Sequence, residues 1–270
     1  MVTASFSRAT SRVDGPFGAL EYLSLGSGTP SSIFAHGLAG SIATTRPFAT
    51  GVPGRRSFLH FRGHGASDAP ENAWTYPALG AELRAVADRV EATRALGVSM
   101  GAGAMCALLE QSPDRFERLV FVLPAVLDQP RTDAALSRLV ALADLVDERD
   151  VEGITDHLVR EQPRAQRDSP AVRTWAAEQA RLLSGTPVSR ALRALPGEVP
   201  LTDRAVLARV NARTLVIGQA DDDAHPEHVA RELAEVLPEA RLEILPPGGV
   251  LWGHRSWVRE LVSTFLGETD

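Results

Sequence analysis

The stretch Gly97-Val98-Ser99-Met100-Gly101 decides the fold, because it joins a strand-like run to a helix-like run. The run before it, 93–98, is short and ends in apolar residues, and the run after it, 102–109, is rich in alanine and leucine. Side chains at Gly97 and Gly101 would collide with the crossing strand and helix, so the two glycines permit a sharp turn. The turn lifts the Ser99 hydroxyl clear of the sheet, near the positive end of the helix. It predicts a nucleophilic serine.

A glycine-rich loop that binds a nucleotide is the competing interpretation of the same region. Its nearest pattern runs over 101–106, but the last position is Cys106 where a glycine is expected. The pattern also follows the third clear strand, whereas a dinucleotide fingerprint usually follows the first. The hypothesis of a nucleotide-dependent oxidoreductase is supported only by this incomplete glycine pattern.

Strand-like and helix-like runs alternate along the chain on both sides of the turn. Each strand-like run is short, apolar and bounded by Gly, Pro or a polar residue, which is typical of strands covered on both faces. These runs are 31–35, 57–61, 93–98, 119–123, 214–217 and 242–245. Between them, apolar residues recur at helical spacing, as in Leu79, Leu83, Val86 and Val90. The order predicts an α/β fold with a mostly parallel, doubly wound central sheet.

The segment 128–211 interrupts this alternation. It shows several helical patterns, among them 136–143, 151–159 and 172–183, and no convincing strand. A crossover between two strands rarely needs more than about 80 residues, so a helical lid over the active face is the favoured interpretation. The expected division is therefore a core of 1–127 and 212–270 with a cap of 128–211.

The composition excludes several kinds of chemistry. All 28 basic residues are arginine, so Schiff-base, pyridoxal phosphate, Walker-A and protein-kinase chemistry lack their lysine. The single cysteine, Cys106, excludes intramolecular disulfides and multi-thiolate metal sites, and we expect it to be a small core residue. No cofactor or metal is expected. Histidine, carboxylate and hydroxyl chemistry remain.

Charge and hydropathy suggest where the protein acts and with what. The net charge of −6, with arginines spread along the chain, argues against a nucleic-acid partner. No apolar run approaches the roughly 20 residues of a membrane span, and residues 1–8 have no apolar core of a secretory signal. We expect a cytoplasmic protein, a monomer or a homodimer, that acts on a small molecule.

A serine nucleophile needs a base, and the base needs an acid. His254 follows the last strand and opens the final helix, and Asp221, Asp222 and Asp223 follow the strand that ends at Ile217. Ser99, one of these aspartates and His254 then occur in the order Ser…Asp…His that this architecture uses. Four of the other histidines form two close pairs without a third ligand, so structural roles are favoured over metal binding: His60 and His64, and His225 and His228.

Five motifs in order resemble the α/β-hydrolase fold superfamily, serine-nucleophile branch, along nearly the whole chain. Residues 36–38 resemble its HG loop, 62–67 its RGxGxS turn and 97–101 its nucleophile elbow. Residues 222–226 resemble its Asp-x-x-x-Pro acid loop, and His254 resembles its base. The resemblance selects Asp222 over its neighbours as the acid. It also implies an oxyanion hole made by the backbone N–H groups of Leu38 and Met100. Val98 and His60 stand where many relatives carry His and Asp, which predicts altered pocket polarity or packing.

The resemblance implies a carboxylic ester hydrolase that acts through an acyl-enzyme on Ser99. The substrate would be a small or medium ester, lactone or thioester, because a helical lid commonly encloses an apolar pocket. We expect the pocket to include His36, Gly37, Val98, Trp252 and Trp175. A carbon–carbon bond hydrolase, an acyltransferase and a perhydrolase fit the same motifs. A ligand-binding protein with little turnover is the alternative of another class.

Overall fold

The computed structural model describes residues 9–132 and 134–268, and it contains one sheet of eight strands in the order β1-β2-β4-β3-β5-β6-β7-β8. The two pairs β1/β2 and β2/β4 are antiparallel, and the strands from β4 to β8 run parallel to one another. The strands are β1 (Ser11–Gly15), β2 (Gly18–Leu25), β3 (Ser31–Ala35), β4 (Arg55–Leu59), β5 (Arg94–Val98), β6 (Arg118–Val122), β7 (Arg213–Gln219) and β8 (Ala240–Leu245). The predicted mostly parallel α/β sheet is confirmed, and the β1/β2 hairpin adds an edge that was not predicted.

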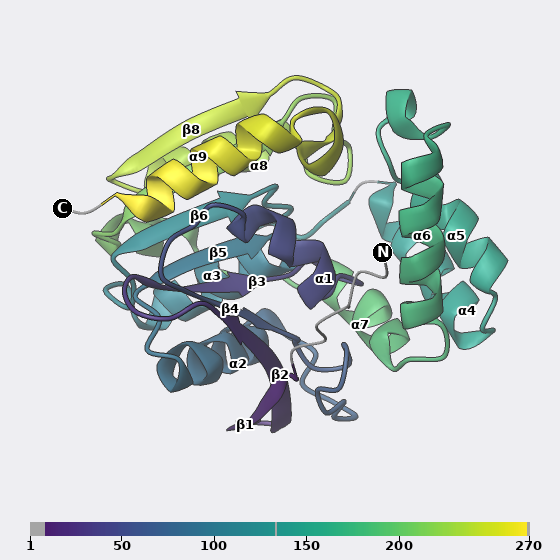
Figure 1. Cartoon of the computed structure of the whole chain (residues 1–270), viewed down its shortest axis with the longest axis horizontal. Helices are drawn as coiled ribbons and strands as arrows, with labels where there is room; N and C mark the ends of the chain where they lie inside the picture. The colour runs from purple at the N-terminus through teal and green to yellow at the C-terminus, as the bar shows by residue number, and fades with distance from the viewer. Residues whose placement is uncertain (1–8, 133, 269–270) are drawn as a thin grey trace, which may run out of the picture.

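Helices cover both faces of the sheet, so the central strands are buried on each side (Figure 1). Because side chains alternate along a strand, Ile33 and Ala35 of β3 join one apolar cluster while Phe34 between them joins the other. The first cluster includes residues of α2 (Tyr76–Arg89), α3 (Met100–Gln111) and α8 (Glu227–Val236), and the second includes residues of η1 (Arg46–Ala49) and α9 (Arg255–Gly267). Cys106 is 1 % exposed in the first cluster, as a core residue should be.

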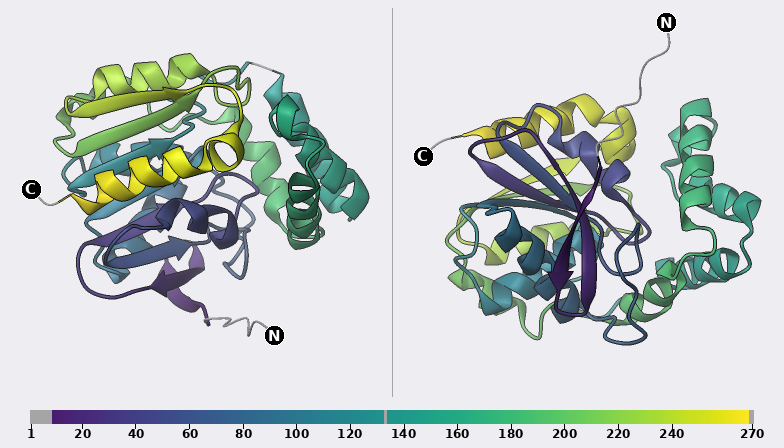
Figure 2. Two further views of the ribbon diagram at one scale, coloured as in Figure 1. Left: turned by 45° about the horizontal axis from the view of Figure 1, so that its top comes forward. Right: turned by 60° about the horizontal axis from the view of Figure 1, so that its bottom comes forward.

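Four helices between β6 and β7 form a separate group beside the carboxyl ends of the strands (Figures 1 and 2). We call this group the helical insertion: α4 (Ala135–Asp147), α5 (Val151–Arg160), α6 (Pro170–Leu183) and α7 (Val188–Ala194). The insertion has its own apolar cluster, in which Ala143, Ile154 and Ala176 are fully buried. The short turn η4 (Arg204–Arg209) returns the chain to the core, where it packs against α3 and α8. Within the described ranges, no helix has both the length and the apolar character to cross a bilayer.

A buried ion pair ties the turn after β4 to α2. Arg62 and Glu82 are 1 % and 2 % exposed, and Arg62 Nε lies 2.7 Å from Glu82 Oε1. Arg62 Nη1 also donates to the Ala73 carbonyl, and the Arg62 backbone N–H donates to Glu82 Oε2. The attraction between the two charges offsets the free-energy cost of removing both from water, so substitution of one residue leaves the other as an unpaired buried charge.

Substitution Glu82→Ala is therefore expected to lower the free energy of unfolding by about 3–5 kcal/mol, because it leaves the buried Arg62 guanidinium without its counter-charge. Urea denaturation measures the change. Asp88→Ala on the same helix is the matched control: Asp88 pairs with Arg115 but is 55 % exposed, so a loss below about 1 kcal/mol is expected. Equal losses in the two variants would contradict this account of the pair.

Candidate active site

Ser99 lies in the sharp turn between β5 and α3, with backbone angles φ +50° and ψ −108°. A positive φ is strained for a residue with a side chain, and the surrounding packing holds it. A Cβ on Gly97 would approach the Gly101 carbonyl oxygen to 2.5 Å, and one on Gly101 would approach the Ala35 carbonyl oxygen to 2.5 Å. The Ser99 N–H also donates to Val122 O at 2.9 Å. Both glycines are needed for β5 and α3 to cross so closely.

The loop after β3 runs directly beside Ser99. A Cβ on Gly37 would lie 3.4 Å from the Ser99 Cβ, which is ordinary contact distance. Leu38 and Met100 both line the cavity in front of Ser99. Among the described residues, neither of their backbone N–H groups has a hydrogen-bond partner. Two free donors beside a serine are the arrangement that an oxyanion hole requires.

Three histidines hold this loop from behind. His64 Nε2 accepts from the Ala39 N–H at 3.2 Å, His60 Nε2 accepts from the Ile42 N–H at 2.9 Å, and His36 Nε2 accepts from the Phe61 N–H at 3.1 Å. Their Nδ1 atoms lie 2.7 to 2.9 Å from Glu21 Oε2 and from the carbonyls of Gly37 and Arg62. Because all six ring nitrogens have partners, these histidines act as structural supports.

His36 therefore does not belong to the pocket, contrary to the sequence-based expectation. It is 1 % exposed and sits under the loop, where its two nitrogens are occupied by backbone groups. The described part of the chain also has no group of three or more His, Cys, Asp or Glu side chains that could hold a metal ion.

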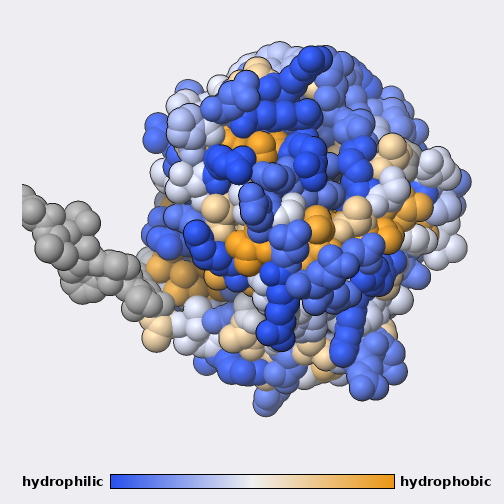
Figure 3. Space-filling model, turned by 90° about the vertical axis from the view of Figure 1, so that its right-hand side faces the viewer, coloured by the Kyte–Doolittle hydropathy of each residue, from blue (hydrophilic) through white to orange (hydrophobic). Residues whose placement is uncertain are grey.

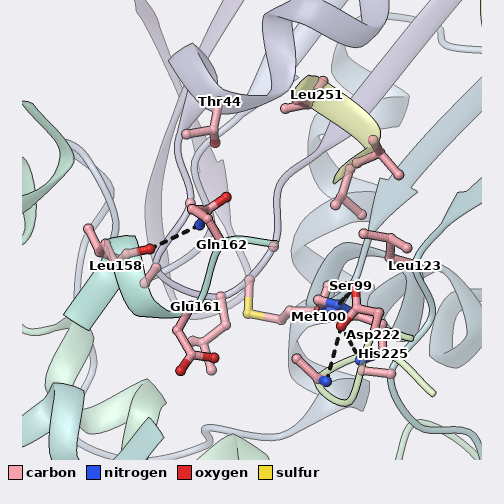
Figure 4. Close-up of a pocket in the computed structure, with 18 of the residues that line it drawn as sticks. Thr44, Ser99, Met100, Leu123, Leu158, Glu161, Gln162, Asp222, His225 and Leu251 are labelled. Carbon is pink, nitrogen blue, oxygen red and sulfur yellow. Dashed lines mark hydrogen bonds and ion pairs between the residues drawn. The ribbon is translucent and has the colours of Figure 1, made fainter. Parts of the chain in front are cut away.

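The histidine that reaches the nucleophile is His225. Its Nε2 lies 3.0 Å from Ser99 Oγ, and its Nδ1 lies 3.0 Å from Asp222 Oδ2 (Figure 4). The remaining Asp222 oxygen, Oδ1, accepts from the backbone N–H groups of Ala224 and His225 at 3.1 and 3.0 Å. With the proton on Nδ1, the imidazole faces Asp222 as a donor and Ser99 as an acceptor.

Asp222 is held in its ionised form. Its burial alone would raise the pKa of the carboxyl group, but the charge of His225 and the hydrogen bonds from His225 and Ala224 lower that pKa below its ordinary value. Asp222 lines the cavity, whereas Asp221 and Asp223 do not and are exposed. The geometry thus brings together Ser99 and Asp222, as the sequence indicated, through a different histidine.

His254 lies away from the nucleophile, which corrects the sequence-based choice of base. Its Nε2 is 3.3 Å from the Pro247 carbonyl oxygen, and its ring packs 6.1 Å from that of Trp257. The cause is the single π-type turn η5 (Gly249–Gly253) that follows β8. This turn directs Gly249, Val250, Leu251 and Trp252 into the cavity, so His254 emerges beyond its wall.

A local signal for His225 was present in the sequence. Asp222 and His225 are three residues apart in one polar loop, and a short aspartate side chain readily accepts hydrogen bonds from the N–H groups two and three residues later. That turn folds the following side chain back beside the carboxylate. The expectation of a base after the last strand led to His254 instead.

A cavity of about 590 Å³ opens in front of Ser99, between the sheet and the helical insertion. Figure 4 shows Ser99, Asp222 and His225 on one side of the cavity. On the other side lie Leu158 of α5 and the two residues Glu161 and Gln162 that follow this helix. Most of the lining is apolar, and it includes four of the five expected pocket residues: Gly37, Val98, Trp175 and Trp252. The outer face of the insertion is largely hydrophilic, with apolar side chains in small separated groups (Figure 3).

Acid is expected to weaken the fold through His64. Burial lowers the pKa of His64 from 6.5 to about 4, so from pH 6.5 down to 4 the unfolded chain binds a proton at this residue and the folded chain does not. The free energy of unfolding should fall by about 3 kcal/mol over this window from His64 alone. Urea denaturation at a series of pH values measures the slope. His64→Gln keeps an acceptor for the Ala39 N–H but does not titrate, so it should give a shallower slope; an unchanged slope would contradict the assignment.

Comparisons with known proteins bear on the fold. A comparison with curated protein sequences finds no significant match. Among solved structures, the chain resembles an esterase from Exiguobacterium antarcticum, with a TM-score of 0.81 and 18% identity, over 96% of this chain and 100% of that one. It also resembles an enol-lactonase from Burkholderia xenovorans, with a TM-score of 0.77 and 20% identity, over 96% of this chain and 100% of that one. A third similar structure is a meta-cleavage product hydrolase from Pseudomonas fluorescens, with a TM-score of 0.77 and 18% identity, over 96% of this chain and 98% of that one. At these identities the likeness is one of fold.

A family model described as the alpha/beta hydrolase fold matches residues 33–251, a range that includes the elbow, the loop after β3 and the loop that carries Asp222 and His225. The chain belongs to the alpha/beta hydrolase fold family.

Proposed function

We propose that this protein is a serine hydrolase that cleaves small or medium carboxylic esters, lactones or thioesters through an acyl-enzyme on Ser99. One observation carries the proposal: the unbroken hydrogen-bond chain from Ser99 Oγ through His225 to Asp222, with both distances at 3.0 Å. The chain ends at a cavity beside two free N–H donors. A nucleophile, an oriented base and oxyanion donors together are the parts that acyl transfer needs.

In the first half-reaction, His225 Nε2 takes the proton of the Ser99 hydroxyl while Oγ attacks the substrate carbonyl carbon. The negative charge that develops on the carbonyl oxygen is stabilised by the N–H groups of Leu38 and Met100, each contributing about 2.7–4 kcal/mol. Asp222 stabilises the imidazolium of His225. The imidazolium then gives its proton to the leaving oxygen or sulfur, the carbonyl re-forms, and the acyl group stays on Ser99.

In the second half-reaction, a water molecule takes the position of the leaving group. His225 accepts a proton from this water as its oxygen attacks the acyl carbonyl, and the same oxyanion donors stabilise the charge. Collapse of the intermediate returns the proton to Ser99 Oγ and releases the carboxylic acid.

The cavity supports a compact, mainly apolar substrate. Trp175 and Trp252 pack edge to face with ring centres 5.8 Å apart, and both line the cavity. One polar side chain stands out: Gln179 on α6 is 6 % exposed, lines the cavity and has no hydrogen-bond partner in the described residues. Because an amide can both donate and accept, Gln179 favours substrates with a hydroxyl or carbonyl substituent over plain alkyl esters.

A panel of esters, thioesters and lactones of graded size, with and without a hydroxyl substituent, tests the activity. Ser99→Ala and His225→Ala are each expected to lower kcat by about 10³-fold or more, because each removes a member of one proton-transfer unit. His254→Ala is the matched control, and its kcat should stay within about 3-fold of the parent because His254 does not reach the cavity. Loss of turnover in His254→Ala with retention in His225→Ala would refute the choice of base.

The acid is tested separately. Asp222→Asn is expected to lower kcat by about 10²- to 10⁴-fold with little change in KM, because the amide no longer stabilises the imidazolium. Asp221→Asn and Asp223→Asn, on exposed neighbours, should keep near-parental kcat values. Equal kcat in Asp222→Asn and the parent would remove Asp222 from the mechanism. Rapid labelling of Ser99 by a fluorophosphonate also separates a hydrolase from a ligand-binding protein without a reactive serine.

A further inference from the structure

The acid and the base of the proposed reaction share one short segment, residues 220–226, which we call the acid–base loop. Unlike Ser99, which is fixed by two crossing elements, this loop is partly open to solvent: the side chains of Asp222 and His225 are 16 % and 23 % exposed. Its internal hydrogen bonds keep His225 beside Asp222. The Ala220 N–H, which donates to the Leu245 carbonyl at 2.8 Å, anchors the start of the loop to β8. A second contact from outside the loop holds the peptide unit next to His225.

The peptide unit between Ala224 and His225 is held at both ends. Its N–H donates to Asp222 Oδ1 at 3.0 Å, inside the loop. Its carbonyl oxygen, on Ala224, accepts from Arg131 Nη2, which comes from a different part of the chain. This peptide directly precedes the His225 side chain, so its orientation sets where the imidazole points. A hydrogen bond from a guanidinium is charge-assisted and roughly twice as strong as a neutral one.

Arg131 lies in the connection between β6 and α4, where the chain leaves the sheet for the helical insertion. It is half-buried and lines the same cavity as Ser99 and His225. An arginine of the insertion itself, Arg138 on α4, reaches the loop at Asp223, with Nη2 and Oδ2 3.1 Å apart. Asp223 is 79 % exposed, so this pair is screened by water and contributes little. The contact that orients the base is the one made by Arg131.

We propose that Arg131 is a positioning residue for His225: by holding the Ala224 carbonyl, it keeps His225 Nε2 at hydrogen-bond distance from Ser99 Oγ. The inference rests on the proposed function, in which His225 is the base. Without the guanidinium, the Ala224 carbonyl loses its partner and the peptide can rotate. A displacement of about 1 Å at a reacting group can cost on the order of 10²-fold in rate, although the substrate still binds.

The test is Arg131→Ala, assayed with an uncharged ester so that no ion pair between Arg131 and the substrate contributes to the rate. The expected result is a fall in kcat of about 10- to 100-fold with KM changed less than about 2-fold. Added guanidinium at concentrations too low to denature should restore part of the lost kcat, because it can donate to the Ala224 carbonyl in place of the side chain. Arg193→Ala is the control: it removes an exposed arginine of the insertion that pairs with Asp144 and does not line the cavity, so kcat should stay within about 3-fold of the parent.

Two results would overturn the proposal. One is an unchanged kcat in Arg131→Ala. The other is a raised KM with an unchanged kcat, which would show that Arg131 contacts the substrate instead. Thermal unfolding checks that the variant folds. If it does not, Arg131→Met decides, because methionine keeps most of the side-chain length but cannot donate to the Ala224 carbonyl. A folded methionine variant with lowered kcat and parental KM supports positioning, and one with parental kcat refutes it.

Failure of this inference is distinguishable from failure of the proposed function. If the parent protein hydrolyses the ester and Ser99→Ala does not, the hydrolase mechanism stands, and the Arg131 variants alone decide the present inference. If Ser99→Ala hydrolyses the ester as fast as the parent, the mechanism itself is wrong and no base needs positioning.

Discussion

The close crossing of β5 and α3 at Ser99 is the constraint on which the rest of the site depends. A side chain at Gly97 or Gly101 would push the helix away from the strand, and the left-handed backbone of Ser99 would relax. Once the crossing is fixed, the start of α3 points at the cavity and supplies the free Met100 N–H. The loop after β3 then needs only to lie beside Ser99 to supply Leu38, and three histidines hold it there. The nucleophile and the oxyanion donors thus form one rigid unit.

The acid and base belong to a second unit that is built differently. Residues 220–226 are held by an aspartate that accepts hydrogen bonds from its own loop, and by Arg131 from the connection between β6 and the helical insertion. The crossing of β5 and α3 fixes Ser99 and the N–H donors, whereas the hydrogen bond from Arg131 holds the loop 220–226. The hydrogen bond between Ser99 and His225 crosses the boundary of the two halves, so the proposed proton transfer depends on how the halves are placed relative to each other.

Sequence reasoning predicted the parts of the fold that are set by local chemistry. The elbow, the parallel strands and the helical insertion follow from glycine spacing and apolar periodicity. Position after β7 left three aspartates open, and the resemblance of 222–226 to the family's acid loop selected Asp222. The β1/β2 hairpin was missed because β1 is an edge strand with the sequence SRVDG, which is mostly exposed and has a single large apolar residue. His36 was misplaced because a sequence cannot tell which side of a loop its side chain faces.

The base was missed for a more instructive reason. A five-residue π-type turn after β8 was enough to carry His254 past the cavity, and no periodicity in the sequence indicates such a turn. His225 could be found only by considering that an acid and a base can share one loop. The order of motifs along the chain therefore predicted the fold family correctly, while the turn geometry decided which histidine lies beside Ser99.

Because Asp222 and His225 lie on one loop, the segment after β8 does not have to position a group for the proposed proton transfer. Residues 249–252 line the cavity as wall only, held by a hydrogen bond from the Gly249 N–H to the buried side chain of Gln219. Changes in length or side chain at this wall alter the shape presented to a substrate and leave the acid–base pair untouched. In the proposed mechanism, the surface that would select a substrate is thus separate from Ser99, Asp222 and His225, which makes this segment a natural starting point for changing selectivity.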